Sequence, residues 1–290
     1  MIYEIKNNNI AVKINSLGAE LWSIQDNDKI EYLWQGEEYW KRKASNLFPY
    51  VGRFTEGKYT YEGKEYFMNI HGFARTSEFQ VIEQTETLLT LALTANENTY
   101  EIYPFKFLFI IKYELDKNTL KITFSVKNND EKVLYFGVGG HPGFFVPIEN
   151  GLDFTDYYLE FDAVQDVERV CLSEDCYVTE GTDPFPLIDG TKIPLQHNMF
   201  DDDAIVLFNM PKTITLKSDK GSKSVSVSYP DMDYLGLWHW PKVEVPYVCI
   251  EPWTSLPSRK NIVEELKEKS DLISLEIGKE YQNQWTIKIN

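Results

Sequence analysis

One histidine of the sequence sits in a setting that can hold it rigidly at a pocket. His141 lies within residues 137–145, which contain four of the sixteen glycines of the chain and one of its four histidines. Pro142 directly after it disfavours helical geometry, so we expect an extended or turning segment here. The glycines allow a ligand or another chain to approach the backbone closely. This pattern suits a histidine that transfers protons, and the alternative is a glycine-rich corner with a structural histidine.

A second candidate for proton transfer is a glutamate that follows an apolar run. Residues 245–250 read Val-Pro-Tyr-Val-Cys-Ile, and Glu251 comes next, ahead of Pro252 and Trp253. A carboxylate at the end of a buried strand is partly desolvated, and desolvation raises its pKa and its basicity. A general base that works near neutral pH needs this property. The alternative is a glutamate held in an ion pair, for example with Arg53.

Three further stretches carry side chains that can bind a polar ligand. Arg53 follows a glycine in the apolar segment 46–54, where a guanidinium needs an anion or several acceptors, and a structural salt bridge also fits. His71 is followed by a glycine and, four residues later, by Arg75. The acidic turn 201–203 precedes a predicted strand, and an aspartate in it can accept a hydrogen bond from a ligand hydroxyl. A solvated acidic turn is the alternative there.

Aromatic residues and missing motifs narrow the chemistry. Trp238 and Trp240 offer faces that stack on the C–H faces of sugars, although such residues also fill cores. The sequence has no Gly-x-Ser-x-Gly elbow, no P-loop and no dinucleotide fingerprint. Nucleophilic serine chemistry, nucleotide hydrolysis and nicotinamide redox chemistry therefore lack support.

Composition limits the partners and the compartment. The formal net charge of -16 disfavours nucleic acids and anionic membrane surfaces as partners. The three cysteines form an odd set without metal-type spacing, and the four histidines are scattered, so we expect reduced thiols and no metal site. The amino terminus lacks a signal pattern and no apolar run is long enough to span a membrane, which favours a cytoplasmic protein.

Period-two patterning dominates the elements that must position these residues. Alternating apolar positions predict strands that share this pattern, over residues 58–61, 65–67, 89–93, 107–113, 120–126, 132–136, 204–208, 213–217, 224–229, 247–251, 273–277 and 285–289. Only residues 37–43 and 261–269 suggest short helical segments. Many short strands separated by turn residues predict an all-β protein with a large antiparallel β-sandwich. We expect a single domain over residues 1–290.

Several of these stretches together resemble the aldose 1-epimerase (galactose mutarotase) family. The matching pieces are Val-Gly-Arg-Phe at 51–54, His-Gly-Phe at 71–73, Gly-His-Pro-Gly at 140–143, the Asp-Asp-Ala turn at 202–204 and Cys-Ile-Glu-Pro-Trp at 249–253. They occur in the order found in the family and span most of the chain. The family fold, a large antiparallel β-sandwich, agrees with the strand pattern.

The resemblance implies a mutarotase that interconverts the α and β anomers of a hexose without a cofactor or a metal. Glu251 would take the proton of the anomeric hydroxyl and His141 would protonate the ring oxygen. Arg53, His71 and an aspartate of the acidic turn would bind hydroxyls, with Asp203 preferred over Asp202. Glu251 is expected to be ionised and His141 protonated in the resting state.

Two alternatives stay open at this stage. The Gly-Gly-His-Pro-Gly context of the second histidine differs from that of galactose mutarotases and is shared in part with glucose-6-phosphate 1-epimerases, in which Arg53 and Arg75 would bind the phosphate. A carbohydrate-binding or sensing protein without useful turnover is the other alternative. In each case the partner is a small-molecule sugar, and the chain is a monomer or a homodimer. We expect His141 and Glu251 to face one pocket, a sugar ring apart, with the glycines giving the ring oxygen access to His141.

Overall fold

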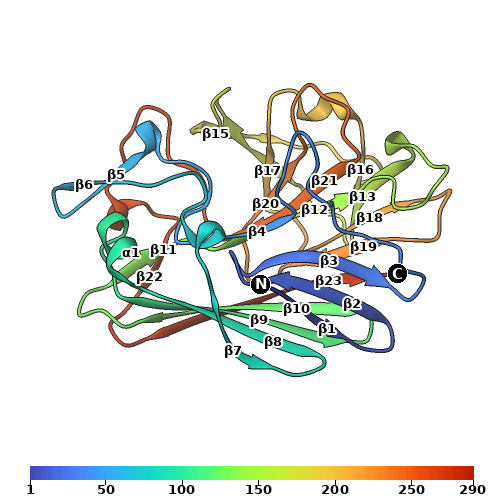
Figure 1. Ribbon diagram of the computed structural model, residues 1–290. Helices are drawn as coiled ribbons and strands as arrows, with labels where there is room; N and C mark the ends of the chain where they lie inside the picture. The colour runs from blue at the N-terminus through green and yellow to red at the C-terminus, as the bar shows by residue number, and fades with distance from the viewer.

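The computed structural model describes all 290 residues and consists mainly of two large antiparallel sheets (Figure 1). The nine-stranded sheet has the order β16 (Lys192–Pro194), β13 (Tyr157–Phe161), β18 (Thr213–Ser218), β19 (Val225–Ser228), β23 (Glu280–Ile289), β10 (Thr119–Asn128), β9 (Phe107–Asp116), β8 (Leu88–Thr94) and β7 (Gln80–Gln84). The seven-stranded sheet has the order β15 (Val178–Pro184), β14 (Glu168–Leu172), β17 (Ile205–Phe208), β20 (Tyr234–Trp238), β21 (Tyr247–Trp253), β12 (Gly139–Phe145) and β4 (Ala44–Leu47). The prediction of an all-β antiparallel sandwich is confirmed.

Smaller elements complete the fold. Three strands at the amino terminus, β1 (Ile2–Lys6), β2 (Ile10–Asn15) and β3 (Glu20–Asp26), form a separate sheet, and two pairs join β5 (Lys58–Tyr61) to β6 (Lys64–Phe67) and β11 (Leu134–Phe136) to β22 (Ile273–Leu275). The helical elements are α1 (Glu97–Ile102) and the 3-10 turns η1 (Thr55–Gly57), η2 (Ala74–Thr76), η3 (Phe154–Asp156), η4 (His197–Phe200) and η5 (Leu266–Glu268). None of these short helices has the length and hydropathy that crossing a bilayer requires.

The two large sheets pack face to face over the main hydrophobic core. Ile122 on β10 and Val248 and Ile250 on β21 all belong to one cluster of 66 buried residues. Trp285 on β23 reaches across and packs against the backbone of Gly140 on β12, where a Cβ atom would lie 2.5 Å from the indole ring. A side chain at position 140 would therefore push the sheets apart.

The opposite face of the seven-stranded sheet is also covered, and this explains the apolar run before Glu251. Side chains alternate along a strand, so Val248 and Ile250 face the main core while Tyr247, Cys249 and Trp253 belong to two smaller clusters on the other face. Every residue of β21 is buried as a result. Glu251 shares the outer face with Cys249 and Trp253.

The two expected helical segments differ from the structure. Residues 37–43 form an irregular loop, so the prediction of a helix there is wrong. This loop is fixed by side-chain contacts, because Trp34 Nε1 donates to the Trp40 carbonyl and the Lys43 amide donates to Glu20. Residues 261–269 contain only the 3-10 turn η5. Helix α1 was not predicted, although the reciprocal cap between Asn96 and Thr99 is a signal readable in the sequence.

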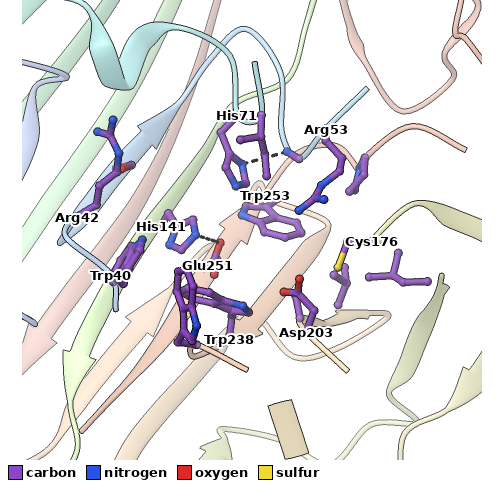
Figure 2. Close-up of a pocket in the computed structure, with 18 of the residues that line it drawn as sticks. Trp40, Arg42, Arg53, His71, His141, Cys176, Asp203, Trp238, Glu251 and Trp253 are labelled. Atoms are coloured by element: carbon purple, nitrogen blue, oxygen red, sulfur yellow. Dashed lines mark hydrogen bonds and ion pairs between the residues drawn. The ribbon is translucent and has the colours of Figure 1, made fainter. Parts of the chain in front are cut away.

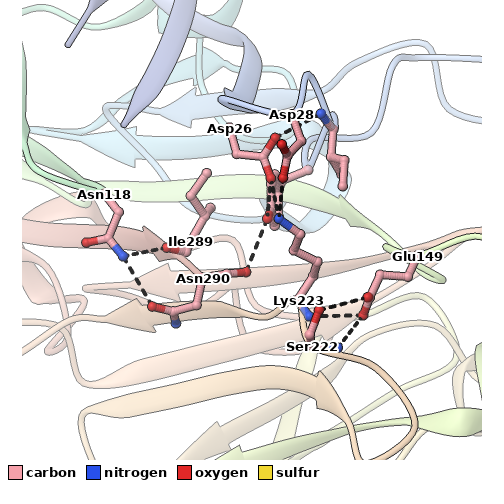
Figure 3. A network of polar contacts seen from close by, with 10 residues as sticks. Asp26, Asp28, Asn118, Glu149, Ser222, Lys223, Ile289 and Asn290 are labelled. Carbon is pink, nitrogen blue, oxygen red and sulfur yellow. Dashed lines mark hydrogen bonds and ion pairs between the residues drawn. The ribbon is translucent and has the colours of Figure 1, made fainter. Parts of the chain in front are cut away.

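A polar network ties the amino-terminal sheet to the carboxyl end of the chain (Figure 3). Asp26 at the end of β3 accepts hydrogen bonds from Lys223 Nζ at 2.8 Å and from the Tyr32 hydroxyl at 3.1 Å. The same hydroxyl lies 3.2 Å from the carbonyl oxygen of Asn290. Asn118 Nδ2 donates a hydrogen bond to the Ile289 carbonyl at 2.7 Å. The hydroxyl of Tyr32 thereby links Asp26 of the amino-terminal sheet to Asn290, the residue that follows β23.

Candidate active site

A cavity of about 430 Å³ lies on the outer face of the seven-stranded sheet, within the size range of small-molecule sites. Its wall contains all six residues predicted for the site, which come from five separate stretches of the chain: Arg53, His71, Arg75, His141, Asp203 and Glu251. Figure 2 shows His141 and Glu251 near the middle, with Arg42 and Trp40 on one side and Arg53, Cys176 and Asp203 on the other. The topology thus brings the predicted residues together.

His141 and Glu251 are direct cross-strand neighbours. Strands β12 and β21 pair with Gly139 opposite Trp253 and Gly143 opposite Cys249, so the register sets His141 opposite Glu251. Facing side chains of an antiparallel pair have Cβ atoms about 4.5–5.5 Å apart. His141 Nε2 accordingly lies 3.2 Å from Glu251 Oε2, and both side chains are buried. The expectation of a gap as wide as a sugar ring is wrong, because adjacent strands leave no room for one.

The glycines around His141 make room for tryptophans. Gly139 and Gly143 lie two residues to either side of His141 and share its face of the strand. A Cβ atom at Gly139 would lie 2.7 Å from the Trp253 ring, and one at Gly143 would lie 2.7 Å from the Trp40 ring. The expectation that these glycines open the backbone to the ligand is therefore wrong, since tryptophan rings occupy the space.

Aromatic rings enclose the imidazole of His141. The ring of Trp40 stacks on it, with centroids 5.0 Å apart and planes 28° apart, and Trp238 meets it edge-on at 5.8 Å. The faces of indole rings attract cations. Trp40 therefore favours the protonated form of His141 relative to an aliphatic neighbour. The sequence analysis missed Trp40, because the loop that carries it was predicted to be a helix.

Burial favours the neutral forms of the central pair. Removal from water lowers the pKa of His141 to about 3, and the charges of Arg75 and Arg42 act in the same direction. Burial, together with the charge of Asp203, raises the pKa of Glu251 well above its ordinary value. Both shifts disfavour the resting carboxylate and imidazolium that we expected from the sequence. The neutral pair and the ion pair hold the same number of protons, so the transfer of one proton interconverts them.

His71 has its ring orientation and tautomer fixed by Gly52. The amide of Gly52 donates to His71 Nδ1 at 3.1 Å, and the amide of His71 donates to the carbonyl of Gly52 at 2.7 Å. Burial lowers the pKa of His71 well below its ordinary value. The neutral ring then carries its proton on Nε2, so that it can donate a hydrogen bond to a ligand oxygen.

Of the three aspartates in the acidic turn, Asp203 is the one on the cavity wall. Asp202 is exposed, and Asp201 accepts a hydrogen bond from the amide of Lys242. Asp203 has a left-handed backbone with φ of 75°, an arrangement that aspartate tolerates better than most residues. Burial and the charge of Asp203 raise the pKa of the neighbouring Cys176 thiol to about 12. Cys176 is thus a neutral group on the cavity wall.

Three arginines on the cavity wall have no carboxylate partner. Arg42, Arg53 and Arg75 take part in none of the ion pairs of the structure. Arg42 donates to the carbonyl of Arg75 at 3.0 Å, and the buried Nε of Arg75 has no hydrogen-bond partner. Burial lowers the pKa of Arg75 to about 10, and the charge of Arg42 adds to this effect. Arg42, which the sequence analysis missed, therefore forms with Arg75 a cationic end of the cavity.

Comparison with known proteins shows the family of the chain. The sequence profile described as aldose 1-epimerase matches residues 1–288. The chain belongs to the aldose 1-epimerase family. It is 30% identical to protein LacX (plasmid) of Lactococcus lactis subsp. lactis, over 96% of this chain and 97% of LacX.

Two solved structures are closely similar to this chain. A galactose mutarotase related enzyme from Lactobacillus acidophilus is 36% identical, with a TM-score of 0.94 over 100% of this chain and 97% of that chain. A galactose mutarotase-like protein from Lactobacillus casei is 27% identical, also with a TM-score of 0.94, and both chains are covered completely. The prediction of the family from five short stretches is confirmed.

Proposed function

We propose that this protein is an aldose 1-epimerase that interconverts the α and β anomers of a hexose, with His141 and Glu251 as its acid–base pair. The observation that carries the proposal is the 3.2 Å contact between His141 Nε2 and Glu251 Oε2 in a cavity of about 430 Å³. The anomeric hydroxyl and the ring oxygen of a sugar are both bonded to C1. An acid and a base that serve these two oxygens must themselves lie close together.

Ring opening uses the ion-pair form of the dyad. The carboxylate of Glu251 takes the proton of the anomeric hydroxyl, the C1–O5 bond breaks with its electrons moving to O5, and His141 gives its Nε2 proton to O5. The product is an open-chain aldehyde, and the dyad is left in its neutral form. Rotation about C1–C2 presents the other face of the aldehyde, and the reversed proton transfers close the ring. Burial stabilises the neutral form, which is the form that closes the ring.

The other wall residues supply binding. His71 offers an Nε2–H donor, Arg53 offers a guanidinium and Asp203 accepts hydrogen bonds, which together suit sugar hydroxyls. Trp238 and Trp253 offer apolar faces to the C–H faces of the ring. Such groups hold the sugar with C1 at the dyad.

The test replaces the proposed base with an uncharged side chain of the same shape. Glu251→Gln should lower the catalysed rate of anomer exchange by roughly 100-fold or more, the usual range for loss of a general base. Polarimetry on freshly dissolved α-glucose and α-galactose measures the rate. Asp202→Asn, which alters an exposed neighbour of the cavity, is the matched control and should keep the wild-type rate. A Glu251→Gln enzyme with an unchanged rate contradicts the proposal.

A second candidate substrate is a hexose 6-phosphate, and the cationic end of the cavity favours it. A free hexose has no negative charge for Arg42 and Arg75, whereas a phosphate accepts hydrogen bonds from guanidinium groups in a planar, paired geometry. Arg42 lies on the side of the cavity away from Arg53 (Figure 2), and it is Arg42 whose charge acts on Arg75, whereas the sequence led us to expect Arg53 and Arg75 as the pair. Arg75 remains part of the candidate phosphate site, with Arg42 as its neighbour.

Rates on matched sugars separate the two candidates. Galactose is compared with galactose 6-phosphate, and glucose with glucose 6-phosphate, by their kcat/KM values. If the phosphate binds at this end, Arg42→Met or Arg75→Met should lower kcat/KM for the phosphorylated sugar by roughly 10- to 100-fold, and should change the free sugar far less. Lys41→Met, at an exposed neighbouring position, is the control. Equal losses on both members of a pair rule out a phosphate subsite.

A further inference from the structure

We propose that His141, Cys249 and Glu251 form a binding site for a thiophilic divalent cation such as Zn²⁺. One ligand atom from each of these buried residues lies within 4.8 Å of the other two. The set consists of an imidazole nitrogen, a thiol sulfur and a carboxylate oxygen, which are the donor types that Zn²⁺ prefers. Cys249 had no function in the sequence analysis and has none in the proposed reaction.

The sheet register places the three ligands on one face. Cys249 and Glu251 are two residues apart on β21, so both side chains point to the outer face of the sheet. His141 projects from the neighbouring strand β12 directly opposite Glu251. All three side chains are therefore held by paired backbone, and a tetrahedral ion needs ligand atoms about 3–4 Å apart. The three ligand atoms lie within 4.8 Å of one another, so an ion that draws them together by about 1 Å would reach this spacing.

One buried ring nitrogen lacks a partner, and one buried carboxylate oxygen has a single polar contact. His141 Nδ1 has no hydrogen-bond partner, and Glu251 Oε2 makes the 3.2 Å contact with His141 Nε2 but no hydrogen bond of good geometry. Buried polar atoms nearly always have a partner. An ion bound between the strands would take up the lone pair of Glu251 Oε2, and a ring nitrogen of His141 would be the second ligand.

The charges balance when a divalent ion binds. The ion displaces the thiol proton of Cys249 and the proton held by Glu251, so two protons leave the site. A dication with one thiolate, one carboxylate and a neutral imidazole has no net charge, which suits a buried position. Three protein ligands leave a fourth position for water, and His141 and Glu251 both face the cavity from which this water enters.

Occupation of this site blocks the dyad. The ion uses the carboxylate oxygen and the imidazole that exchange protons with the sugar, so the loaded protein is inactive in anomer exchange. This consequence rests on the proposed function, whereas the binding site itself does not. The site would make the enzyme sensitive to free Zn²⁺ although the reaction needs no metal.

Cobalt(II) serves as a spectroscopic probe of the site. The wild-type protein should bind one Co²⁺ per chain and show a thiolate-to-cobalt charge-transfer band. Cys249→Ser and Cys249→Ala should lose this band, and Cys176→Ser should keep it, because Cys176 is the other buried thiol and lies outside the ligand set. Far-ultraviolet circular dichroism checks that each variant is folded. Absence of the band from the wild type, its survival in both Cys249 variants or its loss in Cys176→Ser overturns the proposal.

The effects of Zn²⁺ on stability and on anomer exchange test the consequences of metal binding. Zn²⁺ should raise the unfolding temperature of the wild type and inhibit its anomer exchange, and it should do neither in Cys249→Ser. A cobalt band in a protein without mutarotase activity leaves the metal site standing and contradicts the proposed function alone. Mutarotase activity in a protein without a cobalt band contradicts only the metal site.

Discussion

The indole ring of Trp40 lies stacked on the imidazole of His141, with centroids 5.0 Å apart. Trp40 belongs to the irregular loop 37–43, whereas His141 belongs to the paired strand β12. A residue of a loop thus sets the electrostatic environment of a residue held rigidly by the sheet. The stack bears on the proposed chemistry, because ring opening requires a protonated His141.

Replacement of Trp40 should slow anomer exchange. Trp40→Leu removes a cation–π contact worth about 0.5–2 kcal/mol, which corresponds to a fall in kcat of roughly 2- to 30-fold. Polarimetry at saturating sugar gives the value. Tyr39→Leu is the matched control, because Tyr39 is an exposed aromatic residue of the same loop. A Trp40→Leu enzyme with full kcat indicates that the stack has no effect on the imidazolium.

A methyl group at Gly236 should disturb Glu251, the proposed base. Gly236 on β20 lies opposite Glu251, and a Cβ atom there would come 2.8 Å from the Trp253 ring and 3.2 Å from Glu251 Cβ. Gly236→Ala should cost about 1–3 kcal/mol of unfolding free energy through overpacking and lower kcat/KM. Urea unfolding and polarimetry measure the two effects. Adding Trp253→Phe to Gly236→Ala should recover part of the stability, and a double variant less stable than both single variants contradicts the steric explanation.

His71 should tolerate asparagine better than phenylalanine. Phenylalanine leaves the buried amide of Gly52 without an acceptor, at a cost of about 1–3 kcal/mol, and it removes the donor that faces the cavity. Asparagine supplies both an acceptor and a donor, and it suits the left-handed backbone of His71, whose φ is 66°. We expect a larger rise in KM and a larger loss of unfolding free energy for His71→Phe than for His71→Asn. Equal losses in the two variants contradict the assigned hydrogen bond.

Asp26 should make stability depend on pH. Burial by itself raises the pKa of Asp26, but hydrogen bonds from Lys223, the Ile30 amide and Tyr32 outweigh it, so the folded-state pKa lies below the ordinary value. A lowered pKa stabilises the fold above the unfolded-state pKa of about 3.9. This contribution disappears as the pH falls through the lower folded-state value.

The comparison of two aspartates tests this dependence. Asp26→Asn should cost about 1–2 kcal/mol at pH 7, and the difference from wild type should shrink below about pH 4. Denaturant unfolding across this pH range gives the free energies. Asp28→Asn is the control, because Asp28 is 76% exposed and its contact with Lys223 is longer, at 3.4 Å. A cost for Asp26→Asn that does not vary with pH contradicts the role of the carboxylate.

Much of the fold and site follows from local patterns in the sequence. Alternation along residues 107–126 predicts strands β9 and β10, and the chain does form them. Glu251 and His141 could be singled out because each has an unusual local setting. Their 3.2 Å contact could not be predicted, because it depends on the pairing of β12 with β21, which are about one hundred residues apart in the chain.

One physical reason explains why some residues of the cavity could not be predicted from the sequence. Trp40 and Arg42 lie in a loop whose conformation is set by Glu20 and by the carbonyl of Arg75, which are distant in sequence. Cys249 looks like an ordinary residue of an apolar run. Alternation along the strand puts it on the same face as Glu251, but its approach to His141 depends on the pairing of β12 with β21. Local periodicity carries no information about such contacts, so these residues became visible only in the folded chain.

The two-sided burial of β21 also links catalytic competence to correct folding. A shift of this strand by a single residue would exchange Glu251 for Ile250 or Pro252 at the cavity and turn a carboxylate into the main core. Misaligned chains would therefore be unstable and would lack the proposed base at the cavity. Activity in this protein should accordingly report the fraction of molecules with native strand alignment, so that a refolding population regains turnover in step with its tertiary structure and not before.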